Sequence, residues 1–329
     1  MSDIDAVITW VDGRDPAHQQ RLATFLAGRG GGSPVSAHPT RFDSADEIDY
    51  CVASIQRHAP WFRRIHVVTD GQVPALLQRL AGTSWAGRVW VVDHREIFTG
   101  FEHFLPTFNS RAIISLLWRI PGLAERFVYF NDDFMLLQPL RETDFFRGES
   151  IVVRGRWRLQ SRYSWTQMRA AHRRHASAGT GEDEASARDA QEAGAQLAGY
   201  RLRYFRLYHY PYSFRRTPLE AFFAQHPGLL EENVRHRLRS SQQFKTEGLA
   251  AHLAIRQGKA VRDGRLRVVQ LDPAARGIAD LRRRMLQADA SADAAFACVQ
   301  SLDMASAEQR TEILDWLGRR IGGRDHVDR

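Results

Sequence analysis

The 329-residue chain contains only two cysteines, Cys51 and Cys298, which lie far apart in the sequence. Neither a framework of disulfides nor a cysteine metal site can be built from this pair. The chain also has no apolar run near the ~18 residues that a membrane-spanning helix needs. Its first five residues lack the basic start and the apolar stretch of a signal peptide. We therefore expect a cytoplasmic protein.

Lysine is almost missing as well, because Lys245 and Lys259 are the only two lysines among 46 basic residues. A bias of this kind reflects the codon supply of a GC-rich genome, so the net charge of +8 is weak evidence for a polyanionic partner. The arginines do cluster locally, within residues 154–174, 201–216 and 235–239. Such density suits nucleic acid, an anionic membrane surface or a phosphorylated small substrate.

Strand and helix signals alternate through the first 140 residues. Apolar, β-branched runs predict strands at 4–11, 64–69, 89–92 and 127–130, and helices are expected at 15–28, 46–58 and 110–118. This alternation predicts an α/β fold with a mostly parallel sheet covered on both faces. Each predicted strand ends in polar or acidic residues, and ligands bind at that edge of such sheets.

The rest of the chain has a different composition. Residues 177–196 are small, polar and acidic, which predicts an exposed loop or a weak helix with some disorder. The last ~50 residues read as helices. The final helix is opened by Ser306 and Gln309, which have the spacing of a capping box.

Asp132 and Asp133 follow the fourth predicted strand. Their hard carboxylate oxygens suit Mg²⁺ or Mn²⁺, and such an ion would bridge the phosphates of a nucleotide. The pair is equally typical of an ordinary turn capped by its own side chains.

Other strand ends carry residues that could bind a substrate, although each also fits a structural role. Trp10 could stack on a base or belong to the core, and the turns after the first three strands contain Asp12 and Gly13, Asp70 and Gly71, and Asp93. Asn109 and Ser110 precede a helix, where one of them caps it and leaves free amides that suit an anion.

Two later segments offer catalytic side chains. His209 lies in a rigid, aromatic stretch and could act as an acid or a base near neutral pH, although a structural histidine is the commoner case. Arg237 and Arg239 could clamp a diphosphate or face solvent on a helix.

Taken in this order, these segments resemble the Stealth family of sugar-phosphate transferases. The resemblance covers a first block at 4–13, a long second block from Arg41 to Asp133, and a third block from His209 to Ser240. The chain departs from the family where Glu47-Ile48-Asp49-Tyr50-Cys51 lacks the usual arginine. It departs again in the fourth block, where Gln270 and Leu271 replace an Asn-Asp pair before Asp272.

The resemblance implies a catalytic domain at 1–275 of the nucleotide-sugar-transferase, Rossmann-like type. Its insert at 141–205 is variable, and a helical region at 276–329 follows. Members of the family transfer a hexose 1-phosphate from a nucleotide diphospho-sugar to a sugar hydroxyl. We therefore expect UDP-N-acetylglucosamine as donor, a saccharide as acceptor and UMP as a product. The resemblance also suggests peripheral association with the membrane machinery of polysaccharide synthesis.

The same resemblance suggests roles for the candidate residues. Asp133, with Asp132, would hold the metal or the donor diphosphate, and Asp272 is a weaker metal candidate. Arg237, helped by Arg239, would neutralise charge on the phosphoryl group, and His209 would move the acceptor's proton. The nucleotide pocket would include Trp10, Asp12, Gly13, Asp70, Gly71 and Asp93, and the sugar or a phosphate would meet Asn109 and Ser110.

Two other functions stay open at this point. A metal-dependent glycosyltransferase would use the same site but release UDP. A nucleic-acid-binding protein would use the arginine clusters, although the acidic strand ends would repel its phosphates in the absence of a metal ion.

Overall fold

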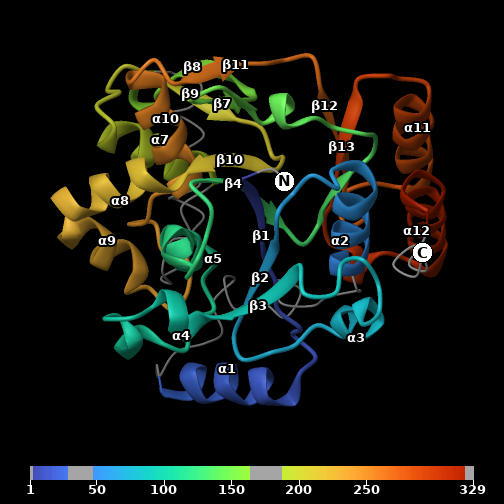
Figure 1. Ribbon diagram of the computed structural model, residues 1–329, viewed down its shortest axis with the longest axis horizontal. Helices are drawn as coiled ribbons and strands as arrows, with labels where there is room; N and C mark the ends of the chain where they lie inside the picture. The colour runs from blue at the N-terminus through green and yellow to red at the C-terminus, as the bar shows by residue number, and fades with distance from the viewer. Residues whose placement is uncertain (1–2, 29–46, 164–186, 323–329) are drawn as a thin grey trace.

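The computed structural model describes residues 3–28, 47–163 and 187–322 (Figure 1). Its central sheet has the order β10-β4-β1-β2-β3. The four strands predicted from the sequence are confirmed, and they run parallel: β1 (Ile4–Thr9), β2 (Ile65–Thr69), β3 (Val89–Asp93) and β4 (Arg126–Asn131). The fifth strand, β10 (Tyr212–Arg215), pairs with β4 in the antiparallel sense.

Helices cover both faces of this sheet, as the sequence predicts. The first five are α1 (Pro16–Gly28), α2 (Glu47–His58), α3 (Leu76–Leu80), α4 (His94–Ile97) and α5 (Ser110–Leu116). Helices α2 and α5 lie on opposite sides of the central strands (Figure 1). Strand β1 is therefore buried on both faces, which explains why its sequence is a nearly continuous apolar run.

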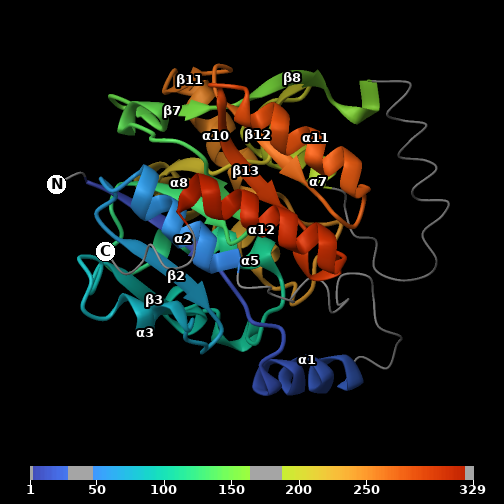
Figure 2. The same cartoon turned by 90° about the vertical axis from the view of Figure 1, so that its right-hand side faces the viewer.

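A second sheet, ordered β12-β13-β5, lies beside the first. Its strands are β5 (Phe134–Leu136), β12 (Arg267–Leu271) and β13 (Ala294–Val299), and it is accompanied by α11 (Ile278–Asp289) and α12 (Ala307–Ile321). Helix α12 packs along α2 (Figure 2), and Trp316 joins Tyr50 and Met135 in one apolar cluster.

The expectation of an all-helical C-terminal region is therefore wrong. Alanine favours helices, but all six residues of β13 are buried between β12 and β5, and this tertiary burial outweighs local propensity. The predicted capping box is confirmed, because Ser306 and Gln309 bond reciprocally at the start of α12.

The remaining elements form a third region around α10. They comprise β6 (Phe146–Arg147), β7 (Ser150–Val153), β8 (Gly155–Leu159), α7 (Ala187–Leu197), β9 (Arg203–Leu207), α8 (Arg216–Gln225), α9 (Pro227–Val234), α10 (Thr246–Arg256) and β11 (Ala260–Arg262). Strands β8 and β9 pair as an antiparallel ribbon. Short 3₁₀ turns occur at Glu102–Phe104, Leu117–Arg119, Glu142–Asp144, Ser161–Tyr163 and Leu302–Met304.

Helix α7 corrects the prediction of an exposed segment at 177–196. Residues 177–186 lie outside the described residues, but 187–197 are helical, and Ala190, Gly194 and Ala195 are buried. A methyl group added at Gly194 would lie 2.7 Å from the carbonyl oxygen of Lys245. Small side chains therefore let α7 approach the start of α10 closely, and their scarcity of apolar atoms does not make the segment exposed.

At the amino-terminal edge of the central sheet, Asp5 is buried and fully bonded. Its carboxylate accepts hydrogen bonds from Arg63 Nε (2.9 Å), Arg63 Nη2 (2.6 Å) and the backbone amide of Ala124 (2.9 Å), and His66 Nε2 lies 3.2 Å away. Burial alone would raise the pKa of Asp5, but the bonds to His66, Arg63 and Ala124 outweigh it and lower the pKa to about 2.

Both cysteines are buried and free. Among the described residues, no helix combines the length and the apolar character that crossing a membrane requires.

Candidate active site

A cavity of about 1460 Å³ opens at the carboxyl ends of β1, β2 and β4. The structure brings together in its wall half of the residues singled out from the sequence: Trp10, Asp70, Ser110, Asp132, Asp133, His209 and Arg239. These residues come from six separate parts of the chain. The cavity is therefore the place where the candidate residues converge.

Several other candidates lie outside the cavity wall and have structural contacts instead. The Asp12 carboxylate accepts a hydrogen bond from the amide of Arg14 (2.9 Å), Asp93 caps α4 in a capping box, and Asp272 accepts a bond from the amide of Ala275 (3.3 Å). Gly71 has φ +68°, a left-handed conformation that favours glycine in this turn. Gly13 accepts a bond from Gln19 through its carbonyl oxygen.

Asn109 and Arg237 hold two loops together rather than facing the cavity. The side-chain amide of Asn109 donates to the carbonyl oxygens of His236 (2.7 Å) and Leu238 (2.9 Å), while its oxygen caps α5. The Arg237 guanidinium donates to the carbonyl oxygens of Phe104 (3.1 Å) and His103 (2.9 Å). Arg239, two residues later, does line the cavity, and its Nη2 donates to Ser110 Oγ at 2.9 Å.

Asp132 and Asp133 form an acidic pair at the end of β4. No cationic side chain pairs with either carboxylate among the described residues, and Asp133 Oδ1 is buried without a hydrogen-bond partner. Burial raises the pKa of Asp132 well above its usual range, and the nearby charges of Asp133 and Glu47 add to this. Burial likewise raises the pKa of Asp133 to about 7, despite a bond from Cys298. The site therefore holds two adjacent carboxyl groups whose ionised forms are not stabilised by any cationic partner among the described residues.

His209 lies beside this pair. Its ring packs edge-on against Phe134, with 4.7 Å between the ring centroids, and its Nδ1 lies 3.5 Å from the hydroxyl of Tyr212. Burial lowers the pKa of His209 to about 3, and the charges of Lys245 and Arg239 contribute. The imidazole is therefore neutral at physiological pH.

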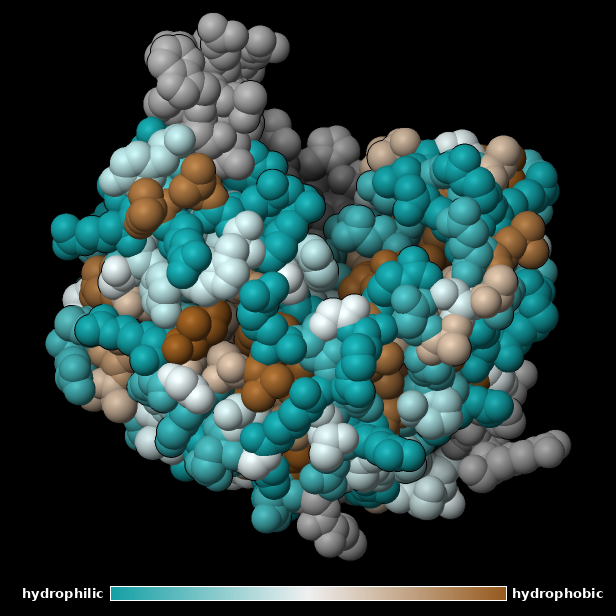
Figure 3. Space-filling view, turned by 90° about the horizontal axis from the view of Figure 1, so that it is seen from above, coloured by the Kyte–Doolittle hydropathy of each residue, from teal (hydrophilic) through white to brown (hydrophobic). Residues whose placement is uncertain are grey.

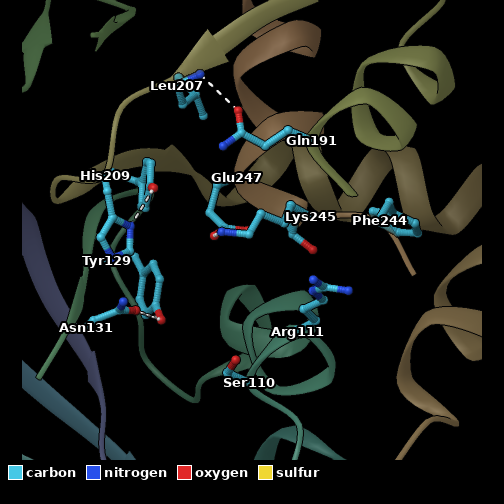
Figure 4. A network of polar contacts seen from close by, with 12 residues as sticks. Ser110, Arg111, Tyr129, Asn131, Gln191, Leu207, His209, Phe244, Lys245 and Glu247 are labelled. Carbon is cyan, nitrogen blue, oxygen red and sulfur yellow. Dashed lines mark hydrogen bonds and ion pairs between the residues drawn. The ribbon is translucent and has the colours of Figure 1, made fainter. Parts of the chain in front are cut away.

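The site also contains residues that sequence reasoning missed. Lys245 and Glu247, at the start of α10, lie between His209 on one side and Arg111 with Ser110 on the other (Figure 4), and Lys245 Nζ is 3.5 Å from Glu247 Oε1. Glu47 of α2 also lines the cavity. Glu47 lies in the segment 47–51, where the chain lacks the arginine that is usual in the family, and this departure could have pointed to Glu47. The start of α10 contains no motif that could have pointed to Lys245 or Glu247.

Near the ends of β1 and β3, the cavity wall holds polar atoms without partners. Trp10 Nε1, Thr107 Oγ1 and His94 Nδ1 are buried and make no hydrogen bond among the described residues. Burial lowers the pKa of His94 to about 4, so this ring is also neutral. These atoms can bond to a polar ligand that enters this end of the cavity.

One group of side chains can hold a metal ion. One donor atom each from Asp133, His209 and Cys298 lie within 4.8 Å of one another. Oδ1 of Asp133 is buried without a hydrogen-bond partner, and the neighbouring residue Asp132 lines the same cavity with a second carboxyl group. This donor set, with its excess of negative charge, fits a divalent cation.

The chain matches two conserved regions of a known family. Residues 2–30 match Stealth protein conserved region 1, and residues 41–153 match Stealth protein conserved region 2.

Two bacterial relatives illustrate the similarity. An exopolysaccharide phosphotransferase of Streptomyces coelicolor is 34% identical over 265 residues, which are 78% of this chain and 41% of the relative. A capsular polysaccharide phosphotransferase of Actinobacillus suis is 36% identical over 169 residues, which are 51% of this chain and 43% of the relative. The matched part of the chain thus spans about two-fifths of the length of these relatives.

A solved galactosyltransferase, LgtC, in complex with donor and acceptor sugar analogs, is 11% identical, with 96% of each chain covered and a TM-score of 0.42. A likeness of this degree is too distant to establish a shared fold or activity.

Proposed function

The chain belongs to the Stealth family, whose conserved regions 1 and 2 it carries, and from this we propose that it is a sugar-phosphate transferase of polysaccharide synthesis. The observation that carries the proposal is the acidic pair Asp132 and Asp133, unneutralised in a cavity beside the neutral ring of His209. The reaction moves a hexose 1-phosphate from a nucleotide diphospho-sugar to a sugar hydroxyl.

The bonds that change define the reaction. The acceptor's oxygen attacks the phosphorus that bears the sugar, and an oxygen–phosphorus bond forms. The bond from that phosphorus to the bridging oxygen of the diphosphate breaks, so a nucleoside monophosphate leaves. We assign the acceptor's proton to His209, because its imidazole lies beside the acidic pair in the cavity wall.

Asp132 and Asp133 would hold a divalent cation, Mg²⁺ or Mn²⁺. Such an ion neutralises charge on the diphosphate and on the leaving phosphate. The free Oδ1 of Asp133 supports this assignment, because a buried carboxylate oxygen without a partner is costly unless a ligand completes it.

Positive side chains complete the phosphate site. Arg239, Lys245 and Arg111 line the cavity and can neutralise charge on the phosphoryl oxygens. Arg237, which the sequence suggested for this role, donates to backbone carbonyl oxygens outside the cavity wall. We therefore assign the charge-stabilising role first to Arg239.

The nucleotide would bind at the ends of β1 and β2, where ligands enter such sheets. Trp10 offers an aromatic face and a free indole N–H there, and Thr107 and His94 offer further polar atoms. We propose a UDP-sugar as donor, with N-acetylglucosamine as the sugar.

Product analysis tests this function. Purified protein is incubated with UDP-N-acetylglucosamine, an oligosaccharide acceptor and Mg²⁺ or Mn²⁺, and the released nucleotide is identified by chromatography. We expect UMP together with a phosphodiester-linked product, and neither with the Asp133→Asn variant. Release of UDP instead would make the protein a metal-dependent glycosyltransferase and would overturn the proposal.

A further inference from the structure

Two arginines face each other across the β8–β9 ribbon. Arg156 of β8 and Arg206 of β9 are directly opposite in the register, and both line the cavity. Like charges placed directly opposite each other in an antiparallel pair destabilise it. An anion bound between the two guanidinium groups would offset this repulsion.

Neither guanidinium is neutralised within the described residues. Arg156 and Arg206 make no ion pair or side-chain hydrogen bond there, and the same holds for Arg188 of α7, which also lines the cavity. Other arginines of the cavity wall differ: Arg267 pairs with Asp293 at 2.6 Å and Arg284 with Asp280 at 2.9 Å. The charge at the ribbon is therefore available to a ligand.

The ribbon lies on the acceptor's side of the site. In the sheet order β10-β4-β1-β2-β3, the acidic pair follows β4, whereas Trp10 and Asp70 follow β1 and β2 on one side of it. His209 precedes β10 on the other side, and Arg206 is three residues before His209. Three residues span at most ~10 Å, so the ribbon leads directly to the proposed base.

The surface above this region is open to a polar molecule. Seen from above, the side of the molecule that carries β8, β9 and β11 shows hydrophilic residues with apolar ones among them, and a hollow separates it from the side formed by α11 and α12 (Figure 3). A charged saccharide can be accommodated on such a surface without burying its polar groups against apolar side chains.

We propose that Arg156 and Arg206, with Arg188, bind an anionic group carried by the acceptor saccharide. The guanidinium fork bonds phosphate and carboxylate alike, so the group is either one. This inference rests on the proposed function, because it assigns the acceptor to the side of the acidic pair that the nucleotide leaves free. An anion site formed by these arginines makes the enzyme selective for acceptors that already carry negative charge.

Binding measurements test the inference without requiring turnover. Isothermal titration calorimetry compares N-acetylglucosamine 6-phosphate, glucuronic acid and neutral N-acetylglucosamine, with UMP and Mn²⁺ present to fill the nucleotide side. The proteins are the wild type, the double variant Arg156→Gln/Arg206→Gln, and the double control Arg158→Gln/Arg203→Gln. Arg158 and Arg203 lie on the same two strands but do not line the cavity, so their loss changes the net charge equally.

We expect at least one of the two anionic sugars to bind about 10- to 100-fold more tightly than the neutral one, and the double variant to lose this preference. The control should keep it. Equal loss in the control, an unchanged double variant, or no preference for either anion would overturn the inference.

Two further measurements separate this inference from donor binding by the same arginines and from the proposed function. Displacement of the bound sugar phosphate by rising UMP would show that the arginines bind the donor, which would overturn the acceptor assignment. The release of UDP in the product assay would overturn the proposed function alone, because the arginine-dependent binding would persist. Unfolding of the double variant, followed by circular dichroism, should show no loss of stability, since its removal of two like charges relieves repulsion.

Discussion

Asp5 and Asp133 lie at opposite edges of the same parallel sheet, and their surroundings differ in kind. Asp5, near the start of β1, bonds to Arg63, His66 and the amide of Ala124, and its pKa falls to about 2. Asp133, just past the end of β4, has no cationic partner among the described residues; the Cys298 thiol lies 3.4 Å from its carboxylate, and burial raises its pKa to about 7.

The carboxylate of Asp5 is stabilised by partners within the fold, whereas the carboxylate of Asp133 needs a ligand to stabilise it. A buried carboxylate with several donors is stabilised by the protein itself. A buried carboxylate without them is stabilised only when a cation or a substrate arrives, and such groups cluster at functional sites. The same distinction applies to Arg237, bonded to backbone carbonyl oxygens, and Arg239, which lines the cavity.

Replacing Asp133 by asparagine should have the largest effect. The variant keeps the shape of the side chain but loses the charge, so we expect turnover to fall on the order of 10³-fold or more at saturating metal. Its melting temperature should stay the same or rise, because repulsion with Asp132 is relieved. Near-normal turnover would show that Asp133 is only a turn residue.

Substitution of Arg239 and of Arg237 tests the same comparison between a residue of the site and a residue of the fold. Arg239→Ala should lower kcat about 100-fold, as expected for one well-placed donor to a charged transition state. Arg237→Ala should lower the free energy of unfolding by about 1–2 kcal/mol, since two bonds to carbonyl oxygens are lost, and should change kcat little. Steady-state kinetics and urea unfolding of both variants check this. The reverse pattern would return the catalytic role to Arg237.

Asp5→Asn should affect the fold alone. Removing one partner of a buried ion pair leaves Arg63 and His66 uncompensated, so we expect a loss of about 3 kcal/mol in the free energy of unfolding. The folded protein should retain normal turnover. Activity assays of the variant at urea concentrations below its unfolding transition check this. A stable but inactive variant would break the comparison between the two aspartates.

The smallest expected effect is the pH dependence that Asp5 confers. Its pKa in the folded protein, about 2, lies below its ordinary value of 3.8, so its stabilisation is complete above about pH 4 and is lost as the pH falls toward 2. The stability gap between the wild type and Asp5→Asn should therefore narrow by about 2 kcal/mol over this range. Urea unfolding at each pH measures the gap, and a constant gap would contradict the assignment.

Part of the fold could be predicted from the sequence because local signals agree with tertiary burial. The apolar runs of β1 and β2 are buried on both faces, and the Ser306 cap opens α12 where expected. Strand β13 could not be predicted, because its alanine-rich sequence is set in a strand only by its neighbours β12 and β5. A weak helix was one of the two expectations for 177–196, but the burial of α7 was missed because its small residues are buried by close backbone approach, which apolar content does not reveal.

The candidate site was predictable where strand ends define it. Trp10, Asp70 and Asp133 follow parallel strands, and the topology brings them together. Side chains from distant elements were not predictable in the same way. Lys245 and Glu247 precede or open a helix without a motif, and the direction of the Arg237 guanidinium depends on the loop at 103–108 that it contacts.

Mn²⁺ binding tests the central claim most directly. Electron paramagnetic resonance counts free Mn²⁺ during titration of the wild type, Asp5→Asn and Asp133→Asn, with UMP present. The account predicts one bound ion per chain in the wild type and in Asp5→Asn, and at least tenfold weaker binding in Asp133→Asn, on the order expected when a metal ligand loses its charge. Undiminished binding in Asp133→Asn would contradict the claim that the uncompensated carboxylates at the end of β4 form the metal site.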